Sequence, residues 1–309
     1  MRHGAAVSRP PAQPSRLTTG PFRGTTAVAR GLLTADQLRS SAWRRLFRDV
    51  YLHRDLPVTH ELRAVAAAGL LLPGAVVSGR SAAVLWGIEL AGTDDDVELT
   101  LPPGRHPVRV GGLRVCRASL AGDDVEGRRG VPATTPEATA LDLARHLEGD
   151  DAVVAVDRVL ASGLVDLGAL RGRAARCTGR GSARARAVCA LADERSESPQ
   201  ETRLRVLLLR AGLPVPVPQF TVRVGGRFVA RVDLAWPDLR VAVEYDGRWH
   251  AEAGQFARDR QRLNRLQEAG WRVVFVTAAD LHRPGELVAR VTRALAAVSV
   301  RSPGPAAGS

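Results

Sequence analysis

The sequence predicts a mixed α/β (α+β) protein with more than one domain. Three observations indicate this class: a length of 309 residues, a hydrophobic content of 45%, and apolar residues that follow helical spacing in some segments and alternate as in strands in others. A chain of this length exceeds the usual size of one domain and buries a sizeable core. We therefore expect a helical N-terminal module, an α/β middle region and a C-terminal sandwich of helices around one sheet.

The N-terminal module has the pattern of a small winged-helix domain. Helices are expected at 25–30, 34–39 and 41–47, followed by a strand at 49–53. In this arrangement Trp43, Arg44, Arg45 and Arg48 would face DNA, with the basic groups on phosphates. In an alternative interpretation, Trp43, Leu46 and Phe47 are core residues and the arginines are merely solvated.

The middle region is expected to be a scaffold. Strands are predicted at 96–101 and 108–117, and helices at 136–147 and 151–162. Thr135 precedes Pro136, which is typical of a capped first helical turn. Asp142 and Asp157 lie inside these helices, where their apolar neighbours account for them without a catalytic role.

The C-terminal region predicts the order helix, three-stranded meander, helix, strand and helix. The expected helices are 198–213, 256–269 and 284–298, and the expected strands are 219–224, 227–236, 240–245 and 271–276. Gly225-Gly226 forms a tight turn between the first two strands.

One hairpin of this region collects carboxylates on one face. Pro237-Asp238-Leu239 is a turn signal, so the flanking strands should pair about the point between Asp238 and Leu239. Asp233 then lies opposite Glu244, where like charges normally destabilise a sheet. A bound Mg²⁺ or Mn²⁺ would relieve that repulsion. A salt-bridge network with Arg231 or Arg258 is the competing explanation.

These residues resemble a known nuclease superfamily. Asp233, ten intervening residues, Glu244-Tyr245-Asp246-Gly247 and then His250 are similar to the PD-(D/E)XK pattern, with the very-short-patch-repair (Vsr-like) endonucleases as the closest branch. The resemblance implies a restriction-endonuclease-like α/β/α core. It also implies that Asp233 and Glu244 hold the metal ion and that Glu201 is the upstream acid.

The lysine of that pattern is absent, and Asp246 stands in its place. The chain contains no lysine, so all 44 Lys+Arg residues are arginines, which do not deprotonate in proteins. His250 is therefore the candidate for proton transfer. Glu201 also has a structural interpretation, because Ser198-Pro199-Gln200-Glu201 matches a helix capping box.

Two further features concern nucleic acid. Arg258 and Arg262 are four residues apart on an expected helix, and their shared face could contact phosphate; a solvated helix face is the alternative. Residues 22–170, including Ser78-Gly79-Arg80-Ser81-Ala82-Ala83 and Leu85-Trp86-Gly87, resemble the N-terminal domain of AbiEi-type antitoxins. The same residues resemble actinobacterial proteins that pair this domain with a Vsr-like one.

The charge of the chain predicts an anionic partner, most simply DNA. The formal net charge is +12, and residues 1–60 hold ten arginines against three aspartates and no glutamate. A GC-rich genome would also enrich arginine.

Three widely spaced cysteines indicate neither a disulfide framework nor a zinc site. Without a signal peptide or membrane span, the expected location is the cytoplasm.

The expected organisation is a disordered start (1–20), a winged-helix-like module (21–60), an antitoxin-like middle region (61–196), a nuclease-type domain (197–300) and a disordered tail (301–309). The sequence favours a Mg²⁺-dependent endonuclease that hydrolyses DNA phosphodiester bonds. Its catalytic candidates are Glu201, Asp233, Glu244, Asp246 and His250. The alternative is a DNA-binding transcriptional regulator or type IV antitoxin-like protein with an inactive nuclease fold, which the missing lysine favours.

Overall fold

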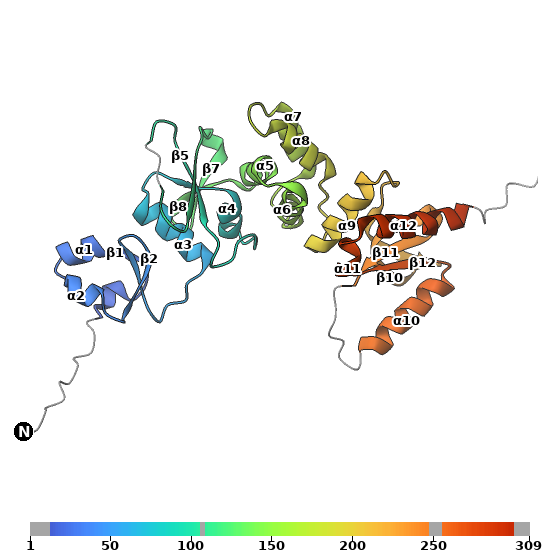
Figure 1. Ribbon diagram of the computed structural model, residues 1–309, viewed down its shortest axis with the longest axis horizontal. Coiled ribbons are helices and arrows are strands. Elements are labelled where there is room, and N and C mark those ends of the chain that lie inside the picture. Colours follow the sequence, from blue (N-terminus) through green and yellow to red (C-terminus); the bar gives the residue numbers. More distant parts are fainter. Residues whose placement is uncertain (1–12, 106–108, 247–254, 300–309) are drawn as a thin grey trace, which may run out of the picture. The chain divides into compact units, whose positions relative to one another are not determined.

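The computed structural model describes residues 13–105, 109–246 and 255–299, with side chains for all of these except 255–259 and 298–299. The chain forms two compact units, Met1–His146 and Leu147–Ser309 (Figure 1). Both units combine helices with strands, so the predicted mixed α/β class is confirmed. Within the described ranges, no helix has both the length and the apolar content that a membrane span needs. The predicted tail lies outside the described residues, and the finer domain boundaries stay predictions.

The first unit begins with a short helix pair and a three-stranded sheet. Its elements are η1 (Ser15–Leu17), β1 (Phe22–Arg23), α1 (Gly24–Ala29), α2 (Ala35–Leu38), β2 (Trp43–Phe47) and β3 (Val50–His53), with the sheet order β1-β3-β2. Thr34 begins α2 with a capping box, because its hydroxyl accepts from Gln37 N and the Gln37 side chain accepts from Thr34 N. Leu17, inside the segment expected to be disordered, is buried with Phe22 and Trp43.

The prediction of a third helix at 41–47 is wrong. Trp43–Phe47 is strand β2, which pairs antiparallel with β3 and shifts register between Arg45 and Phe47. Trp43 packs into the N-terminal core, whereas Phe47 packs into the core of the next sheet. A β-bulge changes the face of a strand, so two apolar residues four apart serve two cores here and imitate one helical face.

Asp49 holds the β2–β3 turn against helix α1. It adopts a φ of +62°, a conformation that aspartate tolerates better than most residues. Its carboxylate accepts hydrogen bonds from Thr25 N (2.7 Å), Thr25 Oγ1 (2.6 Å) and Arg23 Nε (3.1 Å). Its main-chain carbonyl accepts from Gly24 N. The hairpin and the first helix are therefore joined at one residue.

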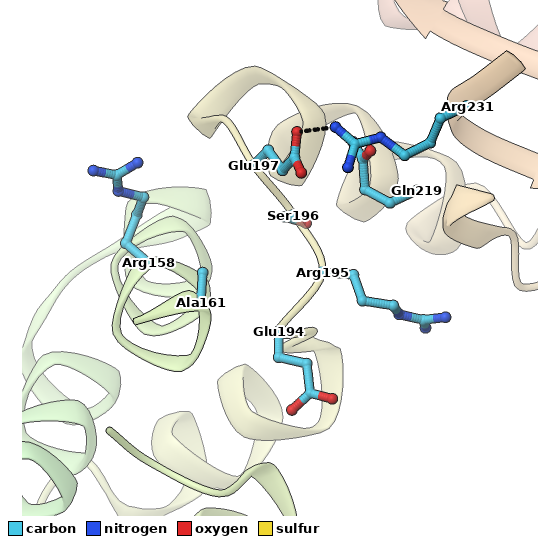
Figure 2. Close-up of a pocket in the computed structure, with 8 residues that line it drawn as sticks. All are labelled: Arg158, Ala161, Glu194, Arg195, Ser196, Glu197, Gln219 and Arg231. Atoms are coloured by element: carbon cyan, nitrogen blue, oxygen red, sulfur yellow. Dashed lines mark hydrogen bonds and ion pairs between the residues drawn. The ribbon is translucent and has the colours of Figure 1, made fainter. Parts of the chain in front are cut away.

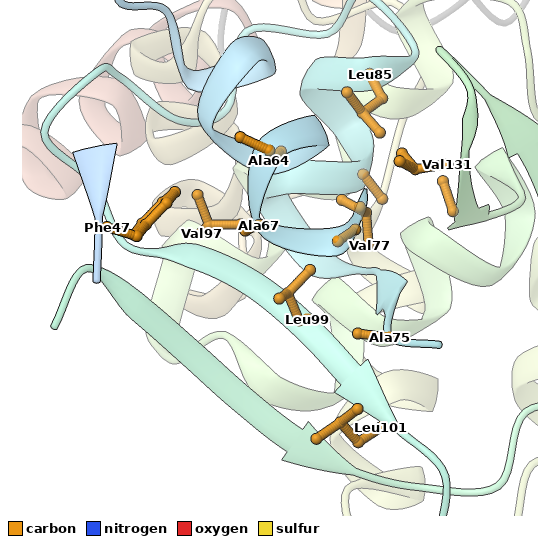
Figure 3. Close-up of a cluster of buried hydrophobic side chains, with 14 of the residues drawn as sticks. Phe47, Ala64, Ala67, Ala75, Val77, Leu85, Val97, Leu99, Leu101 and Val131 are labelled. Carbon is orange, nitrogen blue, oxygen red and sulfur yellow. The ribbon is translucent and has the colours of Figure 1, made fainter. Parts of the chain in front are cut away.

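The rest of the first unit is a five-stranded sheet with helices. Its elements are α3 (His60–Ala66), a π-helical turn η2 (Ala67–Leu71), β4 (Val76–Val77), α4 (Gly79–Leu85), β5 (Val97–Leu101), β6 (Leu113–Arg117), η3 (Gly122–Asp124), β7 (Val125–Arg128), β8 (Val131–Thr134) and α5 (Pro136–His146). The sheet order is β6-β5-β4-β8-β7. Figure 3 shows the core, in which Val97 and Leu99 of β5 pack with Ala64, Ala67 and Leu85 from the helices.

The segment 78–83 begins α4 around a buried carboxylate. Glu98 accepts hydrogen bonds from Arg80 N (2.8 Å) and Arg80 Nε (3.0 Å). Gly79 has a φ of +55°, and a Cβ there would lie 1.9 Å from Glu98 Oε2, so only glycine fits. Ser81 Oγ accepts from Glu98 N and lies 2.7 Å from His60 Nε2, which ties α3 to the same network.

The second unit consists of a helical part and a sheet domain. Its helices are α6 (Gly149–Ala161), α7 (Leu167–Arg176), α8 (Ser182–Leu191), α9 (Pro199–Arg210), η4 (Pro237–Leu239), α10 (Gln255–Glu268), α11 (Ala278–Leu281) and α12 (Pro284–Ser299). Its strands are β9 (Val217–Val224), β10 (Arg227–Trp236), β11 (Val241–Tyr245) and β12 (Arg272–Val276), in the order β12-β11-β10-β9. β11 and β12 are parallel, whereas the other pairs are antiparallel.

Helices cover both faces of this sheet. On one face, residues of α9 and α12 pack on Leu234, Trp236, Val241 and Val243. On the other face, Leu266 of α10 packs with Ala235, Ala242 and Trp271. The sheet face that carries Asp233 and Glu244 therefore packs into a second hydrophobic core near its centre. It is polar only at its end.

A buried ion pair joins α6 to α9. The side chains of Asp157 and Arg205 are 1% and 4% exposed, with Arg205 Nη2 2.6 Å from Asp157 Oδ2. Asp157 also accepts from Thr202 Oγ1 (2.7 Å) and Asp193 N (2.9 Å). Asp157 therefore has the structural role that the sequence predicts, but the reason is a buried ion pair and not its apolar neighbours alone.

We expect Asp157→Ala to lower the free energy of unfolding by about 3–5 kcal/mol, because it leaves the Arg205 charge buried without a counter-ion. Asp151→Ala is the matched control, since Asp151 pairs with Arg203 at the surface, where ion pairs contribute less than about 1 kcal/mol. Urea denaturation of both variants measures the difference. Equal losses in the two variants would contradict the proposed importance of the buried pair.

Candidate functional site

The β10–β11 hairpin brings two acidic residues together. The pairs Leu234↔Val243, Ala235↔Ala242 and Trp236↔Val241 confirm the register predicted from the turn. Continued by one residue, this register sets Asp233 against Glu244. Asp233 Oδ2 accepts a hydrogen bond from Tyr245 N at 2.8 Å, so the main chain of β11 orients the carboxylate. The two predicted metal ligands therefore do lie side by side on adjacent strands.

Glu201 approaches the same place from the N-terminus of α9. Ser198 caps this helix by accepting from Glu201 N at 3.2 Å, but the predicted capping box is incomplete, because the Glu201 side chain accepts from Glu197 N and not from Ser198 N. The Glu201 side chain is buried, and its Oε2 accepts from Glu197 N (3.0 Å) and from Gln219 Nε2 (2.8 Å). Gln219 has a φ of +50° on β9, and no sequence pattern marked it as a partner of this carboxylate.

Arg262 neutralises Glu244. Its Nη1 and Nη2 donate to the two carboxylate oxygens at 2.6 Å each, and Nη2 also donates to the Arg231 carbonyl at 2.6 Å. Such a bidentate contact is among the strongest arrangements for a guanidinium and a carboxylate. Arg231 instead pairs with Glu197 at 2.7 Å. The counter-ion of the opposed acids is therefore an arginine of α10 that the sequence suggested as a phosphate contact.

The electrostatics of the site concentrate on Asp233. Burial raises the pKa of the Asp233 carboxyl to about 6, and the Glu201 and Glu244 carboxylates contribute in the same direction. The Tyr245 N–H and Arg262 oppose this rise. All three predicted acids are therefore close enough to influence one another.

The other predicted site residues lie apart from these acids or outside the described residues. Asp246 is exposed at the end of β11, where its N–H donates to the Val276 carbonyl at 2.7 Å. His250 and the Arg258 side chain lie outside the described residues. In the first unit, Arg44, Arg45 and Arg48 are exposed, the first two on β2 and the third in the turn that follows. Their assignment to DNA stays a prediction.

A pocket of about 400 Å³ lies beside the carboxylates (Figure 2). It is lined by Arg158, Ala161, Glu194, Arg195, Ser196, Glu197, Gln219 and Arg231. Gln219 connects it to the acidic site through its hydrogen bond with Glu201. Figure 2 shows the side chains of Arg158 and Arg195 pointing in different directions. The pocket therefore does not gather its arginines around one anion.

The carboxylates are of the type that Mg²⁺ and Mn²⁺ prefer, but their present arrangement fits a guanidinium and not a divalent ion. Arg262 engages both oxygens of Glu244, and Asp233 and Glu201 each use an oxygen for N–H donors. In the part of the chain that the structure describes, no three His, Cys, Asp or Glu side chains form a group that could hold a metal ion.

Two proteins of Mycobacterium tuberculosis are similar to almost the whole chain. They are "Uncharacterized protein MT2308" of strain CDC 1551 / Oshkosh and "Uncharacterized protein Rv2248" of strain H37Rv. Each is 33% identical over 264 residues, which cover 84% of this chain and 94% of the relative. The chain belongs to the family of these two proteins.

Residues 67–192 of the chain match the family model described as "AbiEi antitoxin C-terminal domain". The antitoxin resemblance expected from the sequence is thereby shown for this region, although the matching part is the C-terminal domain of such antitoxins. Among solved structures, the crystal structure of the RV2827C protein from Mycobacterium tuberculosis has a TM-score of 0.37 and 15% identity, over 67% of this chain and 84% of that chain.

We expect Asp233→Asn to stabilise the protein at neutral pH. Because the pKa of Asp233 is raised to about 6 from 3.8, its contribution to stability is full below pH 4 and is lost as pH rises through 6. Asparagine can still accept from Tyr245 N but carries no charge. The gain should be about 2–3 kcal/mol at pH 7.5 and should vanish near pH 4. Urea denaturation at both pH values tests this, and a gain independent of pH would contradict it.

Proposed function

We propose that the chain is a DNA-binding regulator of the antitoxin type, in which the N-terminal module contacts DNA. The C-terminal sheet domain serves as a binding module and does not hydrolyse DNA. The observation that carries the proposal is the set of exposed arginines on the β2–β3 hairpin. Together with the short helices α1 and α2, this hairpin forms a small basic module, although Trp43–Phe47 is a strand and not the third helix of the winged-helix prediction.

The hairpin arginines are not neutralised by acids of their own module. Residues 21–60 contain three aspartates, and two of these pair with other arginines, Asp49 with Arg23 and Asp36 with Arg39. Arg44 and Arg45 instead donate to main-chain carbonyls, those of Arg54 (3.2 Å) and Phe47 (3.3 Å). Their positive charges remain available to phosphate groups.

Two further observations support the regulator over the nuclease. The match of residues 67–192 to an antitoxin domain supports a role in a toxin–antitoxin context. The contact of Arg262 with both oxygens of Glu244 supplies the positive charge that the opposed acids need, so their presence does not require a catalytic metal ion.

We expect the full-length protein to bind a 30-bp duplex with a steep dependence on salt concentration, and the triple variant Arg44→Ala, Arg45→Ala, Arg48→Ala to bind more weakly. Each lost phosphate contact should reduce the slope of log K against log salt by about 0.9. Fluorescence anisotropy at four or more salt concentrations measures the slope.

The matched control for this experiment removes the same charge elsewhere. Arg203, Arg210 and Arg283 are surface arginines of the second unit that pair with Asp151, Asp150 and Glu286. Their joint replacement by alanine should leave the slope unchanged. Equal slopes for the wild type and the hairpin variant would overturn the DNA-binding assignment of the hairpin.

A metal-dependent endonuclease is the second candidate, favoured by the convergence of Glu201, Asp233 and Glu244. Under the regulator proposal, we expect Mg²⁺ and Mn²⁺ to leave the melting temperature of the wild type unchanged and plasmid, single-stranded DNA and RNA uncut, because Arg262 engages Glu244. Thermal melting and gel assays with each ion measure both properties.

Variants at the acidic site decide between the two candidates. Arg262→Ala frees the Glu244 carboxylate, and Arg265→Ala on the same helix is the control. Stabilisation by metal in Arg262→Ala alone would mean that the arginine blocks a metal site. Cleavage by the wild type that is lost in Asp233→Asn and Glu244→Gln would favour the nuclease and contradict the regulator.

A further inference from the structure

The β9–β10 hairpin ends in an exposed tip, residues 223–228. Gly225 and Gly226, with φ of +55° and +79°, form the two-residue turn that the sequence predicts. All six residues of the tip are exposed, and two of them are apolar: Phe228 is 62% exposed and Val224 is 53% exposed. Val224 and Phe228 are thus two of the large apolar side chains that the described part of the chain exposes.

A bulge separates this tip from the core. The pairing of β10 with β9 shifts register between Phe228 and Ala230. Beyond the shift, Ala230 and Val232 are buried in the core under α10, whereas the tip has no core beneath it. Bulges of this kind turn the end of a ribbon and redirect its side chains.

The tip is basic on both faces. Arg227 pairs with Val224, and Phe228 pairs with Arg223, so each face of the ribbon carries one arginine beside one apolar residue. The strands from 217 to 232 contain three arginines and no acidic residue. Arg223 donates to the Gly226 carbonyl at 3.1 Å, and Arg227 has no partner among the described side chains.

These features fit the major groove of duplex DNA. The groove is wide enough for a two-stranded ribbon and has a row of phosphates along each wall. A ribbon with one arginine on each face can contact both walls, while apolar side chains at its end contact base edges such as thymine methyl groups. A single aromatic residue does not provide the successive stacking positions that single-stranded nucleic acid uses.

We propose that the tip at residues 223–228 is a second DNA contact, which enters the major groove with Arg223 and Arg227 on phosphates and Phe228 on base edges. The inference rests on the proposed DNA-binding function but concerns a different unit of the chain. It gives the sheet domain a direct part in binding.

The test compares two double variants of the full-length protein. Arg227→Ala with Phe228→Ala alters the tip, and Arg272→Ala with Phe275→Ala alters an exposed arginine and an exposed phenylalanine on β12, at the opposite edge of the sheet. We expect the tip variant to bind a 30-bp duplex about tenfold more weakly and the control to bind within about twofold of the wild type. Both should melt like the wild type, because the altered side chains are exposed.

Single variants separate the two kinds of contact. Arg227→Ala should reduce the salt slope by about 0.9, whereas Phe228→Ala should weaken binding without changing the slope. Replacing thymine by uracil in the duplex should weaken the wild type and leave Phe228→Ala unaffected, because the methyl groups that the ring contacts are gone.

The outcomes distinguish this inference from the proposed function. A wild type that binds no duplex overturns both. A second outcome overturns only the inference: the wild type binds duplex, the Arg44, Arg45, Arg48 variant binds more weakly, and the tip variant binds like the wild type. The tip would then be a surface for another class of partner. Equal losses in the tip variant and the β12 control would also overturn it, since the effect would then follow charge alone.

Discussion

Three of the four buried acids among the described residues are held by arginine, and the chain contains no lysine that could replace it. Glu98 is bound by Arg80, Asp157 by Arg205 and Glu244 by Arg262, in both units and on unrelated elements. Removing an acid from water without such a partner would cost several kcal/mol. Each pair also joins elements distant in the sequence, so these contacts position the helices against the sheets.

The fourth buried acid departs from this rule and defines the candidate site. Among the described residues, Glu201 accepts from two neutral N–H donors, those of Glu197 and Gln219. It lies near Asp233, whose pKa is raised to about 6. Arg262 supplies one full positive charge to three carboxyl groups. The site is thus a polar cluster in which Arg262 holds Glu244 while Asp233 has a raised pKa.

Two hairpins carry exposed arginines that have no acidic partner among the described residues. On the β2–β3 hairpin, Arg44, Arg45 and Arg48 are exposed while the aspartates of the module serve other contacts. At the tip of β9–β10, Arg223 and Arg227 flank exposed apolar side chains. Elsewhere in the second unit, surface arginines such as Arg203, Arg210 and Arg290 pair with acids.

Features that depend only on neighbours along the chain could be predicted from the amino-acid sequence. Turn residues and alternation set the register that opposes Asp233 to Glu244, and Ser198 and Thr34 begin their helices, because hairpins and caps are local. Tertiary structure decided the rest. Trp43 and Phe47 have the spacing of a helical face, but they pack into two different cores of a bulged strand. Only the packing of these two cores distinguishes the strand from a helix. The choice of Arg262 as the counter-ion depends on where α10 lies against the sheet, since a charge pairs with whatever the fold brings within reach.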